Sequence, residues 1–311
     1  MKFAIILLNW NNAPDTLECL ASLKKLDYPS YHIIVVDNGS TDDSAAQIQS
    51  HYPEITLVQN QENLGFAEGN NRGILEAKEV GADMYLLLNN DTIVAPNLLS
   101  ELAKEAKAHP EAGVFGPTIY FYDQPATLWY AGGGVDPKTG RCFHHGCGAS
   151  DQSVQVSEEK EYVCGCALAV RAKVVEKVGL LDQKFFLIWE EIDWCWRIRQ
   201  AGYPCRLAPS AKVWHKVSSS FIDGNRGPMW QYYYCRNRLL FHKKHTPFPN
   251  RLKKGGALEL FELAKTAMSK NNPPRLRLQA KAALLGIRDA FLGKYGKGCL
   301  DRFIHESVVK E

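Results

Sequence analysis

The chain has 311 residues, of which 45% are hydrophobic and 11% aromatic, so it can bury a full core and is not broadly disordered. No apolar run reaches the roughly 18–20 residues that a membrane-spanning helix needs. The net charge of +3 conceals an acidic body and a basic tail: residues 228–311 carry 17 Lys and Arg against 6 Asp and Glu, which leaves 20 against 28 in residues 1–227. Such a tail indicates contact with an anionic surface, either membrane or nucleic acid.

The first residues superficially resemble a signal peptide, but Asn9-Trp10-Asn11-Asn12 follows where a small-residue cleavage site would stand. We therefore interpret Phe3–Leu8 as a buried strand and expect a cytoplasmic protein.

Nine cysteines, an odd number, fit reduced thiols better than disulfides. Two pairs of cysteines, Cys142/Cys147 and Cys164/Cys166, lie near His144 and His145. Neither pair has the spacing of a zinc knuckle, so we interpret these cysteines by default as buried thiols.

The first 120 residues alternate between strand and helix patterns. Nearly continuous apolar runs predict four buried strands: Phe3–Leu8, His32–Val36, Ile55–Val58 and Met84–Leu88. The stretches between them predict four helices: about Asp15–Leu26, Ser44–His51, Glu68–Val80 and Asn97–His109. This alternation predicts a doubly wound α/β fold with a mostly parallel sheet flanked by helices. Ligands of such sheets bind beyond the carboxyl ends of the strands, so we expect the chemistry there.

The pattern changes after Pro117. Residues 117–160 are rich in Gly, aromatic and polar residues, which predicts a long loop that is either functional or disordered. A further strand and two helices are predicted next, at Tyr162–Val170, Lys173–Val178 and Phe185–Gln200. From Trp230 onward the pattern is helical and basic.

Polar segments follow the second and third predicted strands. Asp37 lies in the segment after the second strand. Its position is typical of a turn followed by a helix N-cap, and it is equally consistent with a contact to a nucleobase or ribose. The second segment, Asn63 to Gly73, contains Gly65 and Gly69, which allow a ligand to approach the backbone closely. The helix that begins here suits a diphosphate, with Asn70 or Arg72 adding contacts, although an ordinary Gly-containing loop has the same pattern.

The fourth strand is followed by Asn89-Asn90-Asp91. A carboxylate in this position can hold a hard divalent cation, whose shell the phosphates of a ligand complete. Such a cation neutralises the charge that develops on a departing diphosphate. Since Asp91 alone binds metal weakly, His215 is a candidate nitrogen ligand. The alternatives are a simple turn and a structural histidine.

The segment Phe185–Arg197 is dense in aromatic and charged residues. On a helix Glu190, Asp193 and Arg197 share one face, so that Asp193 and Arg197 can pair, whereas Glu191 points elsewhere. Aromatic surroundings raise the pKa of a carboxyl by desolvation, which suits a general base. The alternative is a solvated acidic face with a structural ion pair.

In chain order, these segments resemble the family-2 glycosyltransferases of GT-A fold, especially the bacterial rhamnosyltransferase branch. The resemblance covers roughly residues 3–245 and rests on these stretches: Leu8-Asn9-Trp10-Asn11, Val36-Asp37-Asn38-Gly39-Ser40-Thr41-Asp42, Asn63-Leu64-Gly65-Phe66-Ala67, Leu88-Asn89-Asn90-Asp91, Trp189-Glu190-Glu191-Ile192-Asp193, Trp214-His215-Lys216 and Tyr232-Tyr233-Tyr234-Cys235-Arg236-Asn237-Arg238.

The resemblance implies roles for individual residues. Glu191 is the base that deprotonates the acceptor hydroxyl, and Glu190 and Asp193 accompany it as catalytic candidates. Asp91 and His215 are implied ligands of Mg²⁺ or Mn²⁺. The implied nucleotide-binding residues are Asn9, Asp37, Asn63, Gly65, Asn70, Asn89 and Asn90. The acceptor-side candidates are Trp189, Arg197, His145 and Arg236. Two departures stand out, because Asn89 replaces the first acid of the family's Asp-x-Asp motif and Glu191 replaces the commoner Asp.

We therefore expect a GT-A catalytic domain at residues 1–245 and a basic, mostly helical extension at 246–311. The expected reaction is inverting, metal-dependent transfer of a sugar from a dTDP- or UDP-sugar to a glycan or lipid-linked glycan in cell-surface polysaccharide synthesis. dTDP-rhamnose is the first choice of donor. The alternatives are a catalytically weak or inactive nucleotide-sugar-binding homologue and, less favoured, a sugar nucleotidyltransferase. A nucleic-acid partner is not expected.

The tail carries apolar residues at helical spacing, with basic residues between them: Leu276, Ala280, Leu284, Ile287 and Phe291. This pattern suits a helix that lies on the anionic inner face of the plasma membrane. It equally suits a helix that packs on the catalytic domain.

Overall fold

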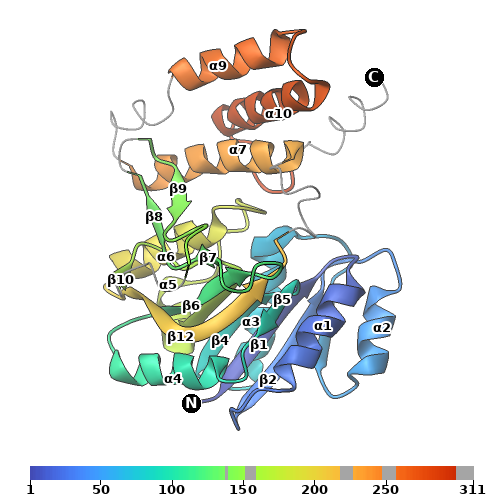
Figure 1. Cartoon of the computed structure of the whole chain (residues 1–311), viewed down its shortest axis with the longest axis vertical. Coiled ribbons are helices and arrows are strands. Elements are labelled where there is room, and N and C mark those ends of the chain that lie inside the picture. The colour runs from blue at the N-terminus through green and yellow to red at the C-terminus, as the bar shows by residue number, and fades with distance from the viewer. Residues whose placement is uncertain (137–138, 151–158, 218–226, 247–256, 299–311) are drawn as a thin grey trace. The chain divides into compact units, whose positions relative to one another are not determined.

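The computed structural model describes residues 1–136, 139–150, 159–217, 227–246 and 257–298. Figure 1 shows the elements, whose bounds are β1 (Phe3–Asn9), α1 (Ala13–Leu23), β2 (Tyr31–Asp37), α2 (Ser44–His51), β3 (Thr56–Gln59), α3 (Gly65–Glu79), β4 (Met84–Asn89), β5 (Thr92–Val94), α4 (Leu98–Ala108), β6 (Val114–Phe121), β7 (Leu128–Tyr130), β8 (Gly133–Val135), β9 (Cys142–His144), β10 (Glu159–Lys160), β11 (Ala167–Arg171), α5 (Ala172–Val178), α6 (Glu190–Gln200), β12 (Cys205–His215), α7 (Pro228–His245), α9 (Ala257–Met268) and α10 (Pro274–Phe291).

A ten-stranded sheet organises the N-terminal two thirds of the chain. Its order is β10-β12-β6-β11-β4-β1-β2-β3, with β5 added to β12 and β7 to β6. The strands β3, β2, β1 and β4 are mutually parallel. β11 runs antiparallel to both β4 and β6, and β6 is parallel to β12. The carboxyl ends of β1, β2, β4, β6 and β12 therefore point to the same edge of the sheet, as the α/β prediction requires.

Helices cover both faces of the parallel strands, which explains why these strands are apolar at nearly every position. On one face α3 lies so close to β1 that a Cβ at Gly73 would come within 2.3 Å of Ile6, and one at Gly69 within 2.6 Å of Leu8. On the other face Thr16 of α1 donates to the side chain of Asn9. Alternate residues of β1 thus face opposite helices.

The four predicted strands and four helices of the first 110 residues are confirmed to within three residues at each end. The expected helix at Phe185–Gln200 is wrong in its first turn, because α6 begins only at Glu190. Three of the preceding residues have positive φ, namely Phe186 (62°), Ile188 (69°) and Trp189 (80°), which no α-helix accommodates. The strand expected at Tyr162–Val170 is also shorter, since β11 starts at Ala167.

The chain divides into two compact units. The first contains residues 1–134, 143–182 and 191–217, and the second contains residues 135–142, 183–190 and 218–311. This division groups α7 with α9 and α10, whereas the sequence suggested a domain boundary after residue 245. Within the described residues no helix is long and apolar enough to cross a membrane.

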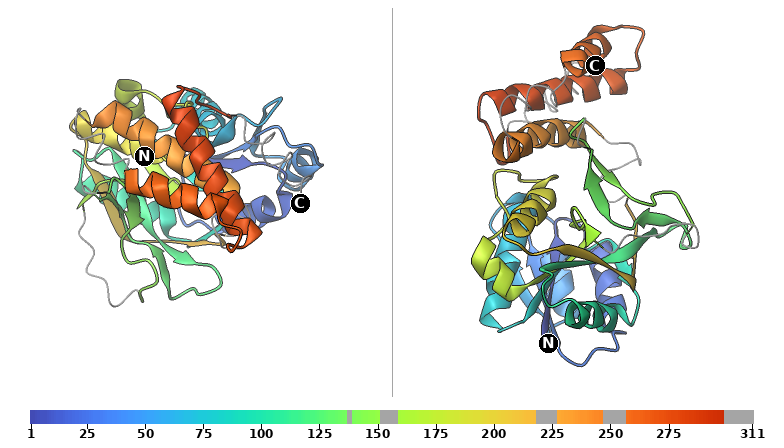
Figure 2. Two further views of the ribbon diagram at one scale, coloured as in Figure 1. Left: turned by 90° about the horizontal axis from the view of Figure 1, so that it is seen from above. Right: turned by 90° about the vertical axis from the view of Figure 1, so that its left-hand side faces the viewer.

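In the second unit α10 lies between α7 and α9 (Figure 1, Figure 2). Gly286 permits close packing, because a Cβ there would lie 2.3 Å from the carbonyl oxygen of Tyr232. The apolar stripe of α10 faces inward in part: Ile287 packs in a cluster with Cys235, and Ala280 is 4% exposed. These positions of the stripe therefore serve helix packing and are closed to lipid.

Two side chains of α7 hold the loop that precedes α6. Asn237 is fully buried, and its Nδ2 donates to the carbonyl oxygens of Phe185, Leu187 and Ile188 at 2.7–2.8 Å. Arg236 donates to Phe185 O at 2.9 Å and to Gly296 O at 2.7 Å. Backbone groups left unpaired by the positive-φ turns are thereby satisfied.

We predict that Asn237→Ala lowers the free energy of unfolding by about 2 kcal/mol, because three buried carbonyl groups lose a donor. Thermal and urea unfolding followed by circular dichroism measure this change. The exposed Asn271→Ala is the matched control and should stay within about 0.5 kcal/mol of the wild type. Equal stability of the two variants would contradict the role given to Asn237.

Candidate functional site

Three parallel strands end side by side in polar residues. Asn9 of β1 is in register with Asp37 of β2, and Leu8 is in register with Asn89 of β4. Because neighbouring parallel strands lie about 4.8 Å apart, the ends of the three strands form one continuous polar edge. The structure thus brings together the side chains that the sequence placed after separate strands.

The Asp37 carboxylate is fixed in place at this edge. Its Oδ1 accepts from Asn9 Nδ2 at 2.8 Å and from the Ser40 hydroxyl at 2.6 Å, and its Oδ2 accepts from Ser40 N at 3.1 Å. Thr16 extends the network, since its hydroxyl donates to Asn9 Oδ1 at 2.8 Å and accepts from Asn90 Nδ2 at 2.9 Å. Asn9, Asp37 and Asn90 therefore form one rigid group.

A second amide organises the loop before α3. Asn38 Oδ1 accepts from Leu64 N at 3.1 Å, and Asn38 Nδ2 donates to Asn63 Oδ1 at 3.1 Å and to Gly65 O at 3.2 Å. Gly65 has a φ of 80°, which only glycine adopts easily. The predicted Asn70 lies one turn further on and donates to Phe66 O. Gly69 faces β1, so its missing side chain serves packing on the sheet.

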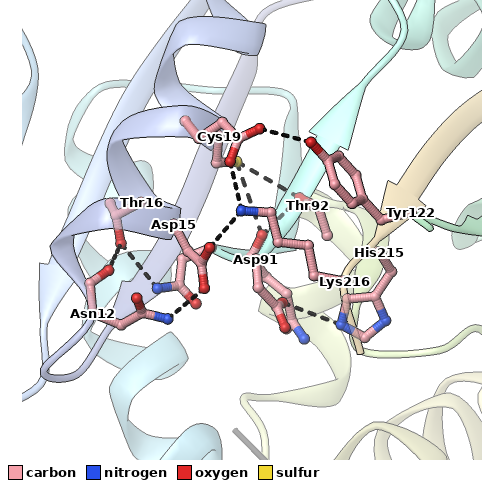
Figure 3. A network of polar contacts seen from close by, with 12 residues as sticks. Asn12, Asp15, Thr16, Cys19, Asp91, Thr92, Tyr122, His215 and Lys216 are labelled. Carbon is pink, nitrogen blue, oxygen red and sulfur yellow. Dashed lines mark hydrogen bonds and ion pairs between the residues drawn. The ribbon is translucent and has the colours of Figure 1, made fainter. Parts of the chain in front are cut away.

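Asp91 and His215 meet at the same edge. β5 begins at Thr92 and pairs antiparallel with the end of β12, which sets His215 opposite Thr92. His215 Nε2 lies 3.1 Å from Asp91 Oδ1, and both residues are buried. His215 Nδ1 is buried too and has no hydrogen-bond partner among the described residues. The two side chains, distant in sequence, are adjacent in the fold (Figure 3).

Lys216 anchors this pair, as Figure 3 shows. Its backbone N–H donates to Asp91 O at 3.0 Å, and its Nζ reaches Asp15 and Glu18 of α1 at 2.5 Å each. Burial lowers the pKa of Lys216, but the hydrogen bonds that its ammonium group donates to Asp15 and Glu18 outweigh burial and raise the pKa above its usual range. A permanently charged Lys216 therefore ties the end of β12 to α1.

The geometry of Asp91 and His215 suits a divalent cation. Adjacent ligands of an octahedral ion with bonds of roughly 2.0–2.1 Å lie about 3 Å apart, which matches their separation. Among the described residues no cluster of three or more His, Cys, Asp or Glu side chains could hold a metal. The protein thus offers two ligands, and a bound diphosphate and water would have to supply the others.

The nearby thiols are poor ligands. Burial raises the pKa of Cys19 to about 12 and that of Cys166 well above its usual range. Because the thiolate is the form that binds metal, burial disfavours both cysteines as metal ligands.

Glu191 lies in the first turn of α6. Burial raises the pKa of its carboxyl to about 7, and backbone N–H groups of Glu191, Ile192 and Gly165 oppose that rise. Its Oε2 is buried without a hydrogen-bond partner among the residues described. A carboxyl with a pKa near neutrality and an open acceptor atom is suited to take up a proton.

A short turn connects Glu191 with the end of β4. Asn89 N donates to Cys166 O at 2.8 Å, so the residues just before β11 close onto the end of β4. Next to Cys166, a Cβ on Gly165 would lie 3.3 Å from the Phe66 ring and 3.5 Å from Glu191 Cβ. Gly165 is therefore the contact point between the loop of Phe66 and the helix of Glu191. Nothing in the local sequence distinguished it from the other glycines.

Two other predicted residues have structural partners. The fully buried Asp193 accepts from Arg197 Nε at 2.8 Å, which confirms the expected pair. Arg197 also donates to the carbonyl oxygens of Val178 and Leu180. Its guanidinium thus joins α6 to the segment after α5, and this position favours a structural role over contact with an acceptor.

The glycine-rich region after Pro117 contributes an aromatic side chain, Trp129, that the sequence analysis did not single out. Trp129 of β7 lies edge-to-face with His215, at a centroid distance of 4.7 Å, and with His144 at 4.6 Å. The predicted His145 is exposed, although partial desolvation, then the charge of Lys160, lowers its pKa. The Trp129 ring thus packs directly against His215 of the Asp91–His215 pair.

Three predicted residues, Trp189, Glu190 and Arg236, belong to the second unit. Trp189 is fully buried against Tyr234 and Phe241, and Glu190 is 4% exposed. Arg236 is fully buried by the carbonyl groups described above. Their positions favour support of the loop before α6 over direct contact with a ligand.

A family model described as "Glycosyl transferase family 2" matches residues 4–179, more than half of the chain. The chain belongs to glycosyl transferase family 2. It is therefore a glycosyltransferase, in agreement with the resemblance stated from the sequence. The match includes the edge residues Asn9, Asp37, Asn89 and Asp91 and ends before Glu191.

Curated relatives support the same branch. The chain is 25% identical over 236 residues to an N-acetylglucosaminyl-diphospho-decaprenol L-rhamnosyltransferase of Mycobacterium tuberculosis, covering 70% of this chain and 76% of the relative. It is 23% identical over 302 residues to the dTDP-rhamnosyl transferase RfbF of Shigella flexneri, covering 91% and 94%.

Solved structures show the fold. The mannosyltransferase PcManGT from Pyrobaculum calidifontis, in complex with GDP-Man and Mn²⁺, aligns with a TM-score of 0.55 at 16% identity, covering 94% of this chain and 73% of that one. GalNAc-T7, with UDP, GalNAc and Mn²⁺, aligns with a TM-score of 0.63 at 14% identity, covering 94% and 56%. The GT-A fold predicted from the sequence is confirmed.

We predict that Gly165→Val reduces sugar transfer at least tenfold, because a branched side chain displaces Glu191 or Phe66, and lowers the free energy of unfolding by about 1–3 kcal/mol. Gly165→Ala is the matched variant and should be milder, because its Cβ fits with small shifts of its neighbours. Initial rates and urea unfolding measure both effects. Unchanged transfer in Gly165→Val would show that the turn does not position Glu191.

Proposed function

We propose that this chain catalyses inverting, metal-dependent transfer of a sugar from a dTDP- or UDP-sugar to a hydroxyl of a glycan or lipid-linked glycan. The observation that carries the proposal is the buried Glu191 carboxyl, held through Gly165 and Cys166 next to the strand end that bears Asn89. A proton acceptor and a polar diphosphate edge thus belong to one connected piece of the fold.

The nucleotide would bind along the polar edge of β1, β2 and β4. Asp37 is oriented by Asn9 and Ser40, so it can accept from a base imide or a ribose hydroxyl without reorganising. The diphosphate would lie near the start of α3, where the helix dipole favours negative charge and Asn63 and Gly65 hold the loop.

Asp91 and His215 would hold Mg²⁺ or Mn²⁺ together with the diphosphate. When bound, the cation acts as a Lewis acid that stabilises the negative charge of the leaving diphosphate. Asn89 in place of an acid reduces the charge of this edge, so we expect cation and nucleotide to bind tightly only together.

Glu191 would take the proton of the acceptor hydroxyl as its oxygen attacks the anomeric carbon. The bond from that carbon to the diphosphate oxygen then breaks, and the electron pair leaves with the nucleotide diphosphate. A single attack from the face opposite the leaving group inverts the anomeric configuration. Burial of Glu191 also keeps water, a competing acceptor, away from the base.

The relatives favour one donor and one acceptor class. Two rhamnosyltransferases are among them, one named for dTDP and one for a diphospho-decaprenol acceptor. We accordingly propose dTDP-rhamnose as the first donor to test and a lipid-linked saccharide as acceptor.

Calorimetric titration with dTDP and UDP tests the donor site. We expect binding that needs Mn²⁺ and that is lost in Asp91→Ala, since the variant removes the one anionic ligand of the pair. Glu79→Ala, at the exposed end of α3, is the control and should bind as the wild type does. Absence of binding to both nucleotides in the presence of Mn²⁺ would reject the donor site.

The pH profile of transfer tests the base. Because Glu191 must be ionised to accept a proton and its pKa is about 7, kcat/KM should rise with pH up to about 7 and then level off. Glu191→Gln should lower transfer by at least about 100-fold while nucleotide binding is retained. Substantial residual transfer in this variant, with an unchanged profile, would assign the base to another group.

A further inference from the structure

The end of α10 carries two apolar side chains that pack on nothing in the described part of the chain. Phe291 is 77% exposed and Leu292 is 61% exposed. The inward face of α10 is already occupied by its contacts with α7, through residues such as Ala283 and Ile287. These two residues are therefore additional to the helix interface, and adjacent exposed apolar side chains mark an interaction surface.

The apolar pair is displayed on a fixed turn. Gly293, with a φ of 70°, ends the helix, and Lys294 N donates to Asp289 O at 2.8 Å. Further on, Lys297 O accepts from the Tyr233 hydroxyl at 2.5 Å. Because hydrogen bonds hold the backbone after Phe291 and Leu292, these residues lose little conformational entropy when a partner binds them.

Positive charge surrounds the pair. Lys281, Lys294 and Lys297 are exposed and make no ion pair within the described residues. The single acid between residues 270 and 298, Asp289, is fully buried and bonded to Tyr232 and to the neighbouring Arg288. Lys281 lies eleven residues before Leu292, about three helical turns, and so falls on the same side of α10. The surface is thus apolar at its tip and basic around it, and residues 270–298 add no exposed acid to it.

We propose that this surface, formed by Lys281, Phe291, Leu292, Lys294 and Lys297, binds the anionic face of a phospholipid bilayer. Phe291 and Leu292 enter the interfacial region, while the lysines remain at the level of the phosphate groups. The charge pattern selects a lipid surface over a second copy of the chain, because two such basic surfaces repel each other. The biological purpose of this contact rests on the proposed function, because a lipid-linked acceptor is found only at a membrane. The membrane contact itself is independent of the proposed function.

Sedimentation of the full chain with vesicles tests the proposal without any sugar donor. We expect binding to vesicles that contain phosphatidylglycerol and weak binding to phosphatidylcholine alone. The double variant Phe291→Ser, Leu292→Ser should weaken binding about tenfold or more. Replacing Lys294 and Lys297 by Gln should weaken it about fivefold for each charge, on anionic vesicles only.

Leu75→Ser is the matched control, because Leu75 is an exposed apolar residue of α3 in the other unit. It should bind vesicles as the wild type does. Wild-type binding by the Phe291/Leu292 variant, or no binding by the wild type, would overturn the proposal. A change of oligomeric state in that variant, measured by light scattering, would assign the surface to self-association and overturn it too. Nucleotide titration of the same variants separates a failure of the membrane proposal from a failure of the proposed donor site, because the titration measures nucleotide binding without vesicles.

Discussion

The backbone hydrogen bond from Asn89 to Cys166 extends the antiparallel pairing of β4 with β11 to the polar edge of the sheet. On one side of it the chain continues to Asp91, and on the other side Gly165 contacts both Phe66 and Glu191. This turn thus fixes the position of the Glu191 carboxyl relative to the polar edge of the sheet. The absence of a side chain at Gly165 is what allows the loop before α3 and the start of α6 to share this turn.

Several buried or half-buried charged side chains of the first unit have an ionisable partner of opposite type. Lys216 is neutralised by Asp15 and Glu18, Asp193 by Arg197, and Asp91 lies against His215. Glu191 makes no ion pair within the described residues, and burial raises the pKa of its carboxyl. Structural ion pairs lower the cost of burial, whereas an uncompensated carboxyl retains that cost, and proteins keep such groups mainly where a proton is moved.

The two sides of α10 have different environments in the second unit. Its inner side packs on α7, whose Arg236 and Asn237 satisfy the carbonyl groups of residues 185–188. Its outer side ends in the basic and apolar turn of residues 291–297. Residues that the sequence suggested for ligand contact, such as Arg236, lie inside this unit because a guanidinium can satisfy several buried carbonyl groups at once.

The sequence by itself determined the order and type of the elements up to residue 110, since strands covered on both faces are apolar at nearly every position and polar loops separate them from the helices. It also determined which polar residues follow each strand, and hence the GT-A fold and the family. Tertiary structure alone decided which of them meet: the pairing of Asp91 with His215, the anchoring by Lys216, the placement of Trp129 and the contact at Gly165. It also decided where α6 begins, because the turn with positive φ at Phe186, Ile188 and Trp189 is stabilised by Asn237, some 50 residues away. The physical reason is the same in each case: local patterns report which face a residue buries, whereas contacts between distant segments depend on strand register and on packing that no local pattern contains.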